Sequence, residues 1–292
     1  MAQPAASNHY PTRDDGPAFG DADYEQFKLA VARATGINLD DYKPEQMRRR
    51  ILAMAEKAGA KRYTHFFQEL QRDPGGIERF WDRITINVSE LFRNPERFAD
   101  LEKYVLPSLA SGLPPGQPLR VWSAGCSFGA EIYSVAILLD ELKIASKLTA
   151  TDLDNGILER ARAGVYLRRD MTHVSEERRK RYFTNKGDSF AVTAALKAGI
   201  DFQRHDLLAG RYPAAAYDLI VCRNVVIYFT EEAKDRVFAK FHQALRPGGV
   251  IFIGGTERIS AHREIGFDLM LPYFYRKTAK MPTLTMVDGG KA

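Results

Sequence analysis

The feature that most constrains the fold is a glycine turn between a predicted strand and a predicted helix, in the stretch Val121-Trp-Ser-Ala-Gly-Cys-Ser-Phe-Gly-Ala-Glu-Ile-Tyr-Ser134. A short apolar run precedes the turn, and apolar residues at helical spacing follow it. A second predicted strand ends at Asp152, 27 positions after Gly125. This order of elements is the first half of a nucleotide-binding α/β sheet, in which the acid usually binds a ribose.

The composition of this turn argues against a dinucleotide. A dinucleotide fingerprint needs G-x-G-x-x-G, whose middle glycine lets the backbone approach a pyrophosphate. Here the glycines are Gly125 and Gly129, Ser127 stands between them, and Glu131 follows where it would repel a phosphate. S-adenosylmethionine fits better, because it has a ribose, a sulfonium and an α-amino group for Glu131. The turn alone also fits an α/β sheet whose glycines merely close the chain.

Length and composition exclude several classes of protein. The 292 residues suffice for two domains, and no apolar run approaches the roughly 18 residues of a membrane helix. The N-terminal residues lack the apolar segment of a secretory signal. Two cysteines exclude a disulfide scaffold, and the six histidines show no metal-ligand spacing. The net charge is only +5, so we expect no nucleic-acid partner. Together these observations lead us to expect a cytoplasmic protein without a metal or a membrane segment.

The periodicity of apolar residues changes along the chain and predicts several parts. These are a disordered tail (1–20), a helical N-terminal domain with a linker helix (21–110), an α/β domain (118–278) with an insertion (about 166–199), and a loose tail (279–292). Within the α/β domain, strands are predicted at 119–123, 147–151, 200–203, 217–222 and 249–254, helices at 130–142, 155–162 and 231–245, and a final hairpin strand within 268–277. This alternation predicts a mostly parallel, doubly wound sheet.

Taken together, five motifs resemble the CheR-type chemoreceptor glutamate methyltransferases over roughly residues 21–278. They are Ile84-Thr-Ile-Asn-Val-Ser-Glu-Leu-Phe-Arg93, Trp122-Ser-Ala-Gly-Cys-Ser, Ala150-Thr-Asp-Leu-Asp154, Cys222-Arg-Asn-Val-Val-Ile-Tyr-Phe229 and Leu245-Arg-Pro-Gly-Gly249. The resemblance implies a class I, Rossmann-like S-adenosylmethionine-dependent methyltransferase domain behind an all-helical domain. It also implies methyl transfer to glutamates of chemoreceptor cytoplasmic helices, with S-adenosylhomocysteine as product. We expect a monomer.

The resemblance carries site residues over position by position. Arg93 and Tyr228 would face the incoming glutamate. The cofactor would be bound by Asn87, Ser89, Arg93, Glu131, Asp152, Asp206, Leu207, Cys222, Arg223 and Asn224. From the residues alone, Arg93 fits a structural ion pair as well, and Tyr228 an ordinary core aromatic.

This chain departs from the family pattern at four positions. Ser89 replaces a threonine, Leu91 an aromatic residue, Ala130 an acid and Gly255 a histidine. Two other functions therefore stay open: a class I methyltransferase with another substrate, and a non-catalytic sensor that binds the cofactor or its product. The second has only Leu91 and Ala130 in its favour.

The predicted reaction explains why no acid–base constellation is found. A glutamate with an ordinary pKa of about 4.3 is already an anion at neutral pH, so methyl transfer to its oxygen needs no general base. Positioning is then the main contribution of the enzyme. We expect Arg93 to align one carboxylate oxygen and leave the other free, and Tyr228 to supply a hydrogen bond or a wall.

The helical domain carries a cluster of basic residues. Between Asp41 and Arg62, seven Lys or Arg (Lys43, Arg48, Arg49, Arg50, Lys57, Lys61, Arg62) stand against three acids (Asp41, Glu45, Glu56). This cluster is either solvated surface or a face that docks an acidic receptor bundle. The insertion at 166–199 is a second candidate docking surface.

Overall fold

The structure is a computed structural model that describes residues 19–84 and 89–278. The described chain forms two compact units. One, the helical unit, comprises 19–39 and 45–76; the other, the sheet unit, comprises 40–44, 77–84 and 89–278. Residues 1–18 of the predicted N-terminal tail, the predicted C-terminal tail and Asn87 lie outside the described residues. Over the described residues, no helix is both long and apolar enough to cross a bilayer.

The helical unit packs three helices around aromatic residues. They are α1 (Asp21–Thr35), α2 (Pro44–Lys57, whose first residue lies in the sheet unit) and α3 (Tyr63–Arg72). The apolar faces of α1 and α3 point into this unit's core, since Phe27, Val31 and Phe67 are almost completely buried. The buried carboxylate of Asp23 on α1 accepts hydrogen bonds from the Tyr63 N–H (2.6 Å) and the Thr64 hydroxyl (2.6 Å), which fixes the start of α3.

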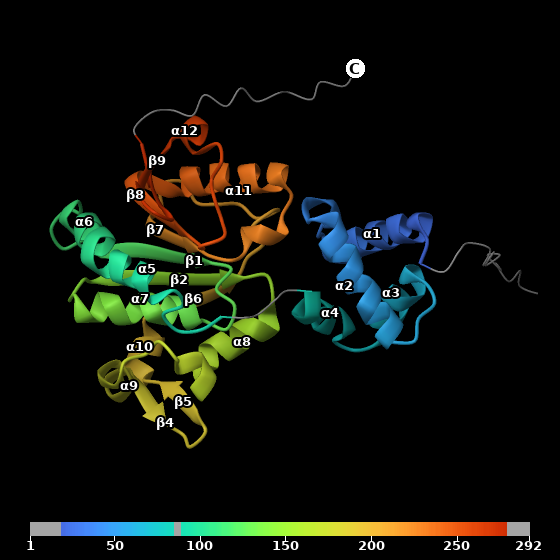
Figure 1. Ribbon diagram of the computed structural model, residues 1–292, viewed down its shortest axis with the longest axis horizontal. Helices are drawn as coiled ribbons and strands as arrows, with labels where there is room; N and C mark the ends of the chain where they lie inside the picture. The colour runs from blue at the N-terminus through green and yellow to red at the C-terminus, as the bar shows by residue number, and fades with distance from the viewer. Residues whose placement is uncertain (1–18, 85–88, 279–292) are drawn as a thin grey trace, which may run out of the picture. The chain divides into compact units, whose positions relative to one another are not determined.

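The sheet unit is built on a seven-stranded sheet in the order β6-β2-β1-β7-β8-β10-β9 (Figure 1). The first five strands in this order are parallel, and β10 runs antiparallel to both of its neighbours. Along the chain the strands are β1 (Leu119–Ala124), β2 (Ser146–Asp152), β6 (Ile200–Arg204), β7 (Tyr217–Cys222), β8 (Leu245–Ile253), β9 (Phe267–Leu271) and β10 (Phe274–Lys277). The predicted α/β class with a mostly parallel sheet is confirmed.

Each central strand is buried on both faces, because alternate residues enter two different cores. On β1, Val121 joins a cluster with α7 (Ala130–Glu141) and α8 (Asn155–Ala163). The next residue, Trp122, joins the cluster under α11 (Glu231–Ala244) and the short α12 (His262–Ile265). Since side chains alternate along a strand, helices on both faces require the continuous apolar runs seen in β1, β7 and β8.

The helices before β1 differ from the predicted grouping. The sequence placed residues 21–110 in one helical domain with a linker helix. The structure instead places α5 (Pro95–Asp100), a π-helical turn (Leu101–Val105) and α6 (Leu106–Ser111) in the sheet unit, along with nearly all of α4 (Gly76–Ile84). The ring of Phe98 lies 5.9 Å from that of Phe252 on β8. Helical periodicity shows that a face is apolar but not which core it covers.

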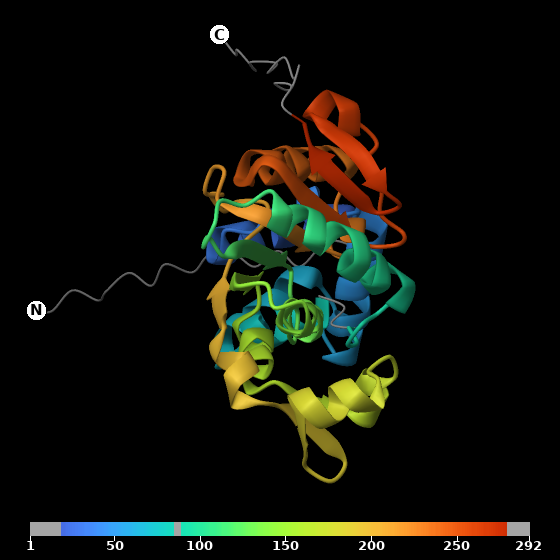
Figure 2. The same ribbon diagram turned by 90° about the vertical axis from the view of Figure 1, so that its left-hand side faces the viewer.

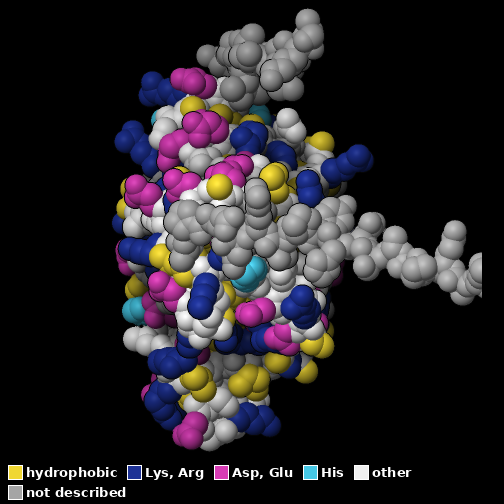
Figure 3. All heavy atoms as spheres, turned by 90° about the vertical axis from the view of Figure 1, so that its right-hand side faces the viewer, with side chains coloured by type: hydrophobic (Ala, Val, Ile, Leu, Met, Phe, Trp, Pro, Cys, Tyr) yellow, Lys and Arg dark blue, Asp and Glu magenta, His cyan; other side chains and the backbone are white. Residues whose placement is uncertain are grey.

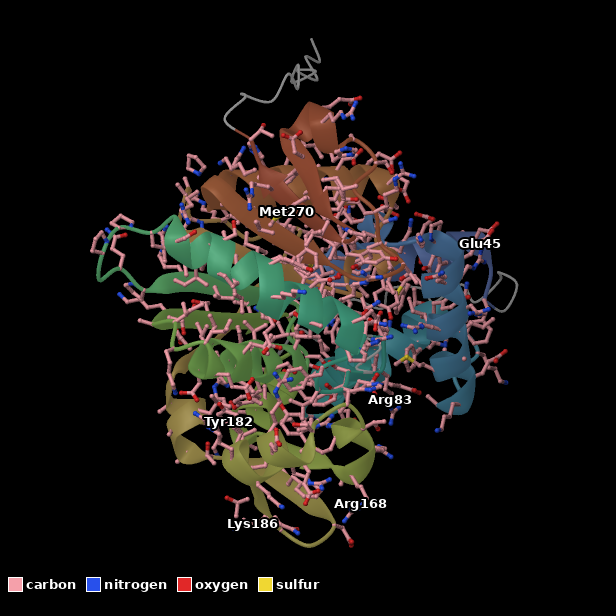
Figure 4. All side chains as sticks on the ribbon, turned by 60° about the vertical axis from the view of Figure 1, so that its left-hand side comes forward. Glu45, Arg83, Arg168, Tyr182, Lys186 and Met270 are labelled. Carbon is pink, nitrogen blue, oxygen red and sulfur yellow. The ribbon has the colours of Figure 1, made fainter. Side chains whose placement is uncertain are left out.

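The insertion forms a small subdomain with its own sheet. Strands β3 (Val165–Leu167), β5 (Ser189–Val192) and β4 (Phe183–Asn185) pair antiparallel in that order. A 3-10 turn (Arg168–Met171), α9 (Glu176–Tyr182) and α10 (Ala194–Ala198) complete it. It projects from the end of the sheet unit opposite the β9–β10 hairpin (Figure 2), with Arg168 and Lys186 toward its tip (Figure 4). Strands β3 and β4, which have three residues each, were not predicted.

We predict that Phe252→Ala lowers the free energy of unfolding by about 3–5 kcal/mol, the usual cost of truncating a buried phenylalanine. Phe252 is fully buried, and its ring stacks on Phe274 at 4.3 Å between centroids. Urea denaturation measures the change. The exposed Leu269→Ala on β9 is the control and should shift stability by no more than about 0.5 kcal/mol. Equal losses in the two variants would contradict the assignment of the core.

Candidate functional site

Most of the predicted site residues line one pocket, which lies at the carboxyl ends of the parallel strands. It holds about 990 Å³ of space outside protein atoms, open solvent at its mouth included. It lies where the chain leaves β1, β2, β6 and β7, the usual ligand position in doubly wound sheets. Its lining comprises Tyr42, Ser89, Glu90, Arg93, Gly125, Cys126, Ser127, Glu131, Asp152, Leu153, His205, Asp206, Leu207, Arg223, Asn224, Val225, Tyr228 and Phe229.

The turn after β1 is held against its neighbours on both sides. The N–H groups of Gly125 and Cys126 both donate to the carbonyl of Thr151 on β2, each at 2.8 Å. Gly125 has φ +78°, and a Cβ there would lie 2.5 Å from a methyl carbon of Val225. Only glycine satisfies both the left-handed backbone and this close approach.

Ser127 explains why this turn differs from a dinucleotide fingerprint. Its N–H donates to the carboxylate of Asp152 at 2.8 Å, so it is engaged within the protein. The other oxygen of Asp152 accepts from the Asp154 N–H at 3.2 Å. Burial raises the pKa of Asp152, and these backbone donors oppose that shift. The carboxylate is therefore fixed at the end of β2.

Glu131, at the start of α7, is a buried carboxyl with one hydrogen bond and one ion pair. Its Oε1 accepts from the Ser123 hydroxyl at 2.9 Å, and its Oε2 lies 3.8 Å from Nη1 of Arg223. Burial raises the pKa of Glu131 to about 7, and the charge of Arg223 opposes the shift. A cationic ligand group beside Glu131 would favour its ionised form.

Arg223 connects Glu131 to the segment that carries Arg93. Its Nη2 donates to the carbonyl of Arg93 (2.9 Å) and to Oδ1 of Asn94 (2.8 Å). Its guanidinium lies over the ring of Phe252, 4.6 Å from the centroid. Burial lowers the pKa of Arg223. Phe92 and Asn94, on either side of Arg93, have left-handed backbones (φ 56° and 62°), and Arg93 lines the pocket.

Several lining residues, Tyr42 among them, were not among the predicted site residues, and neither was Glu257, which lies outside the lining. Glu257 is buried, and its carboxylate accepts four backbone N–H groups, from Gly254, Asn224, Val225 and Val226, at 2.6–3.1 Å. It thereby shapes the turn after β7. Tyr42 lines the pocket from a segment far away in the sequence. Glu257 lies two positions after Gly255, where the chain departs from the family pattern, but no pattern in the sequence marks Glu257 or Tyr42 as a site residue.

The structure brings together most, but not all, of the predicted side chains. The pocket is lined by Ser89, Arg93, Glu131, Asp152, Asp206, Leu207, Arg223, Asn224 and Tyr228. Cys222 is an exception: its side chain is fully buried in the core under α11, one residue before the pocket. Leu91 and Ala130 are also fully buried and outside the lining, so these departures affect packing. Among the described residues, no three His, Cys, Asp or Glu side chains are grouped as metal ligands.

Comparison with known families identifies both parts of the chain. Residues 87–271 match the CheR methyltransferase SAM-binding domain, and residues 22–85 match the CheR methyltransferase all-alpha domain. The chain belongs to the CheR methyltransferase family. The predicted family and the predicted cofactor, S-adenosylmethionine, are thus confirmed.

Several curated relatives resemble the chain over most of its length. It is 43% identical to a chemotaxis protein methyltransferase of Listeria monocytogenes, over 88% of this chain and 97% of the relative. It is 34% identical to chemotaxis protein methyltransferase Cher2 of Pseudomonas putida, over 82% and 92%. It is 30% identical to the chemotaxis protein methyltransferase of Escherichia coli, over 86% and 89%.

The side chains of the pocket fit S-adenosylmethionine. Four carboxylates line it, those of Glu90, Glu131, Asp152 and Asp206, and they suit a ligand with hydroxyl and ammonium groups but no phosphate. The backbone donor of the glycine turn that would otherwise meet a phosphate is bound to Asp152. Arg223 also lines the pocket, and its Nε is buried without a hydrogen-bond partner in the described structure.

We predict that Glu131 makes folding stability depend on pH. Its pKa of about 7 in the folded state lies above its ordinary value of 4.5, so the folded state binds more protons between these values. Stability therefore falls as pH rises through this window. Between pH 5 and pH 8, without ligand, the free energy of unfolding of the wild type should fall by about 1–3 kcal/mol more than that of Glu131→Gln. Urea denaturation at both pH values measures this.

The control for this prediction is Glu232→Gln, which changes an exposed carboxyl on α11. Its stability should follow the wild type at both pH values. If the curves of the wild type and Glu131→Gln run parallel, the carboxyl of Glu131 has no raised pKa.

Proposed function

We propose that this chain transfers the methyl group of S-adenosylmethionine to glutamate side chains of chemoreceptor cytoplasmic domains, giving glutamate methyl esters in the cytoplasm. The observation that carries the proposal is that Arg93 and Tyr228 line the same pocket as Glu131 and Asp152. A cation suited to a carboxylate substrate is thus beside the acids suited to the cofactor. Similarity to relatives named chemotaxis protein methyltransferases supports the choice of receptor.

In this proposal the acidic residues bind different parts of the cofactor. Glu131 binds the ammonium of the methionine portion, and Asp152 binds the ribose hydroxyls. Asp206 and Leu207 flank the adenine. The carboxylate of Asp206 accepts from the N–H groups of Leu208 (2.7 Å) and Ala209 (3.2 Å), which fixes its orientation. Ser89 and Asn224 complete the lining.

The transfer step needs positioning rather than proton transfer. The cofactor supplies a methyl carbon on a sulfonium; the carbon–sulfur bond breaks, a carbon–oxygen bond to the glutamate forms, and a neutral thioether remains. Arg93 aligns the substrate carboxylate, which is already ionised at neutral pH. Tyr228 contributes a hydrogen bond or a wall for the methyl. Since opposite charges cancel during the step, a pocket with little water favours it.

The helical unit offers cations for docking a receptor. Arg48 is held within the unit, paired with Asp21 (2.6 Å) and stacked over Tyr24 (5.2 Å). Arg49, Lys57 and Lys61 are exposed on or beside α2. In the face shown in Figure 3, Lys and Arg side chains are interspersed with Asp and Glu. We therefore propose a local basic face on α2, rather than a broad cationic surface, as a docking site for acidic receptor helices.

We predict that Arg93→Ala lowers kcat/KM for receptor methylation by about 30- to 4000-fold. Truncating one partner of a desolvated charge pair typically costs about 2–5 kcal/mol. The assay follows a radiolabelled methyl group from S-adenosylmethionine to receptor-containing membranes. The label should be released by base, as expected of a carboxyl methyl ester. Arg93→Lys keeps the charge but not the forked donor, and should give an intermediate rate.

Arg97→Ala is the matched control, because Arg97 follows in the same segment but pairs with Asp100 (3.0 Å) outside the pocket lining. It should methylate at nearly the wild-type rate. If the wild type binds S-adenosylhomocysteine but labels no receptor, the chain is a sensor or modifies another substrate. Label that survives base treatment would exclude an ester and so contradict the proposal.

A further inference from the structure

The segment 40–44 is fastened to the sheet unit, although helix α2 begins at its last residue, Pro44. We call this segment the strap. The Thr230 N–H donates to the carbonyl of Asp41, and the Lys43 N–H donates to the carbonyl of Tyr228, each at 2.9 Å. Tyr42 and Phe229 thus face each other in an antiparallel bridge. The carboxylate of Asp41 also pairs with Arg236 on α11.

The side chain of Tyr42 is positioned by this strap. Its ring meets that of Phe229 edge to face, with centroids 5.3 Å apart, and packs on the core under α11. It also lines the pocket. Burial, and then the charges of Asp206, Asp41 and Asp152, raise the pKa of Tyr42, so its hydroxyl stays protonated and can donate.

The packing of Tyr42 indicates which end of the pocket it occupies. Its ring packs on the same cluster under α11 that contains Leu207, the residue assigned to the adenine. Besides burial, the charges of Asp206, Asp41 and Asp152 raise its pKa; these acids include those assigned to the adenine and the ribose and do not include Glu131. Tyr42 is therefore at the adenosine end.

We propose that Tyr42 is a cofactor-binding residue that closes the adenosine end of the pocket, with its ring as a wall and its hydroxyl as a hydrogen-bond donor. The proposal rests on the cofactor roles of Asp152 and Asp206 proposed above. The strap that places Tyr42 also binds the carbonyl of Tyr228, so one short segment supports both the cofactor end and the transfer end of the pocket.

The test separates the two ends of the pocket with two ligands in calorimetry. S-adenosylhomocysteine carries both the adenosine and the amino-acid portions, whereas 5′-methylthioadenosine carries only the adenosine portion. Tyr42→Ala should lower the binding affinity for both ligands by the same factor, on the order of tenfold or more, as expected when an aromatic ring beside a base is removed. Glu131→Gln should weaken only S-adenosylhomocysteine. Tyr42→Phe keeps the ring, so it should lose less affinity for both ligands than Tyr42→Ala does.

Two further variants control for folding. Tyr42→Leu keeps apolar bulk against Phe229 but removes the planar ring and the hydroxyl, so it should bind like Tyr42→Ala even if the alanine variant is unstable. Tyr104→Ala removes a partly exposed tyrosine of the sheet unit outside the pocket lining and should bind both ligands normally.

Three results would overturn the proposal: normal binding of 5′-methylthioadenosine by folded Tyr42→Leu, a loss confined to S-adenosylhomocysteine, or a wild type that binds S-adenosylhomocysteine alone. None of these results would contradict the proposed methylation of receptors, because that activity is measured separately on the wild type. Conversely, a wild type that labels no receptor but shows the expected binding pattern would leave Tyr42 at the adenosine end and reject only the proposed substrate.

Discussion

The site depends on the buried carboxylate of Glu257, which binds the backbone of the turn after β7. By accepting the N–H groups of Asn224, Val225 and Val226, it compensates donors that would otherwise be buried without partners. The turn it shapes presses Val225 toward Gly125 and so limits the turn after β1. In that second turn, the Ser127 N–H donates a hydrogen bond to the carboxylate of Asp152. One carboxylate outside the pocket lining thus determines the shape of two pocket walls.

Much of this arrangement could be predicted from the sequence, because it arises from local patterns. The apolar run of β1, the glycine turn and the acid at the end of β2 follow one another closely, and parallel strands bring their carboxyl ends to one edge of the sheet. Cys222 shows the limit of such reasoning. It ends β7, but side chains alternate along a strand, so Cys222 enters the core under α11 while Arg223 reaches the pocket.

Residues that join the site from a distance could not be found in this way. Tyr42 contacts Phe229, and Glu257 binds Asn224; neither pair is linked by any short-range pattern. For the same reason, the sequence did not show that α5 and α6 belong to the sheet unit. Their apolar face can be recognised in the sequence, but the strand that it packs against, β8, cannot. Periodicity predicts the burial of a face, and only the tertiary fold selects the surface that covers it.

The order of charges in the pocket suits the proposed meeting of a cationic donor and an anionic acceptor. Glu131 would attract the ammonium of the cofactor but repel a substrate glutamate. Arg223 lies 3.8 Å from Glu131 and donates to the carbonyl of Arg93, so a positive charge stands between the acid and the segment that carries Arg93. At such short range this positive charge offsets the repulsion that Glu131 would exert on an incoming carboxylate. Arg93 lines the same pocket and adds a second positive charge for that carboxylate.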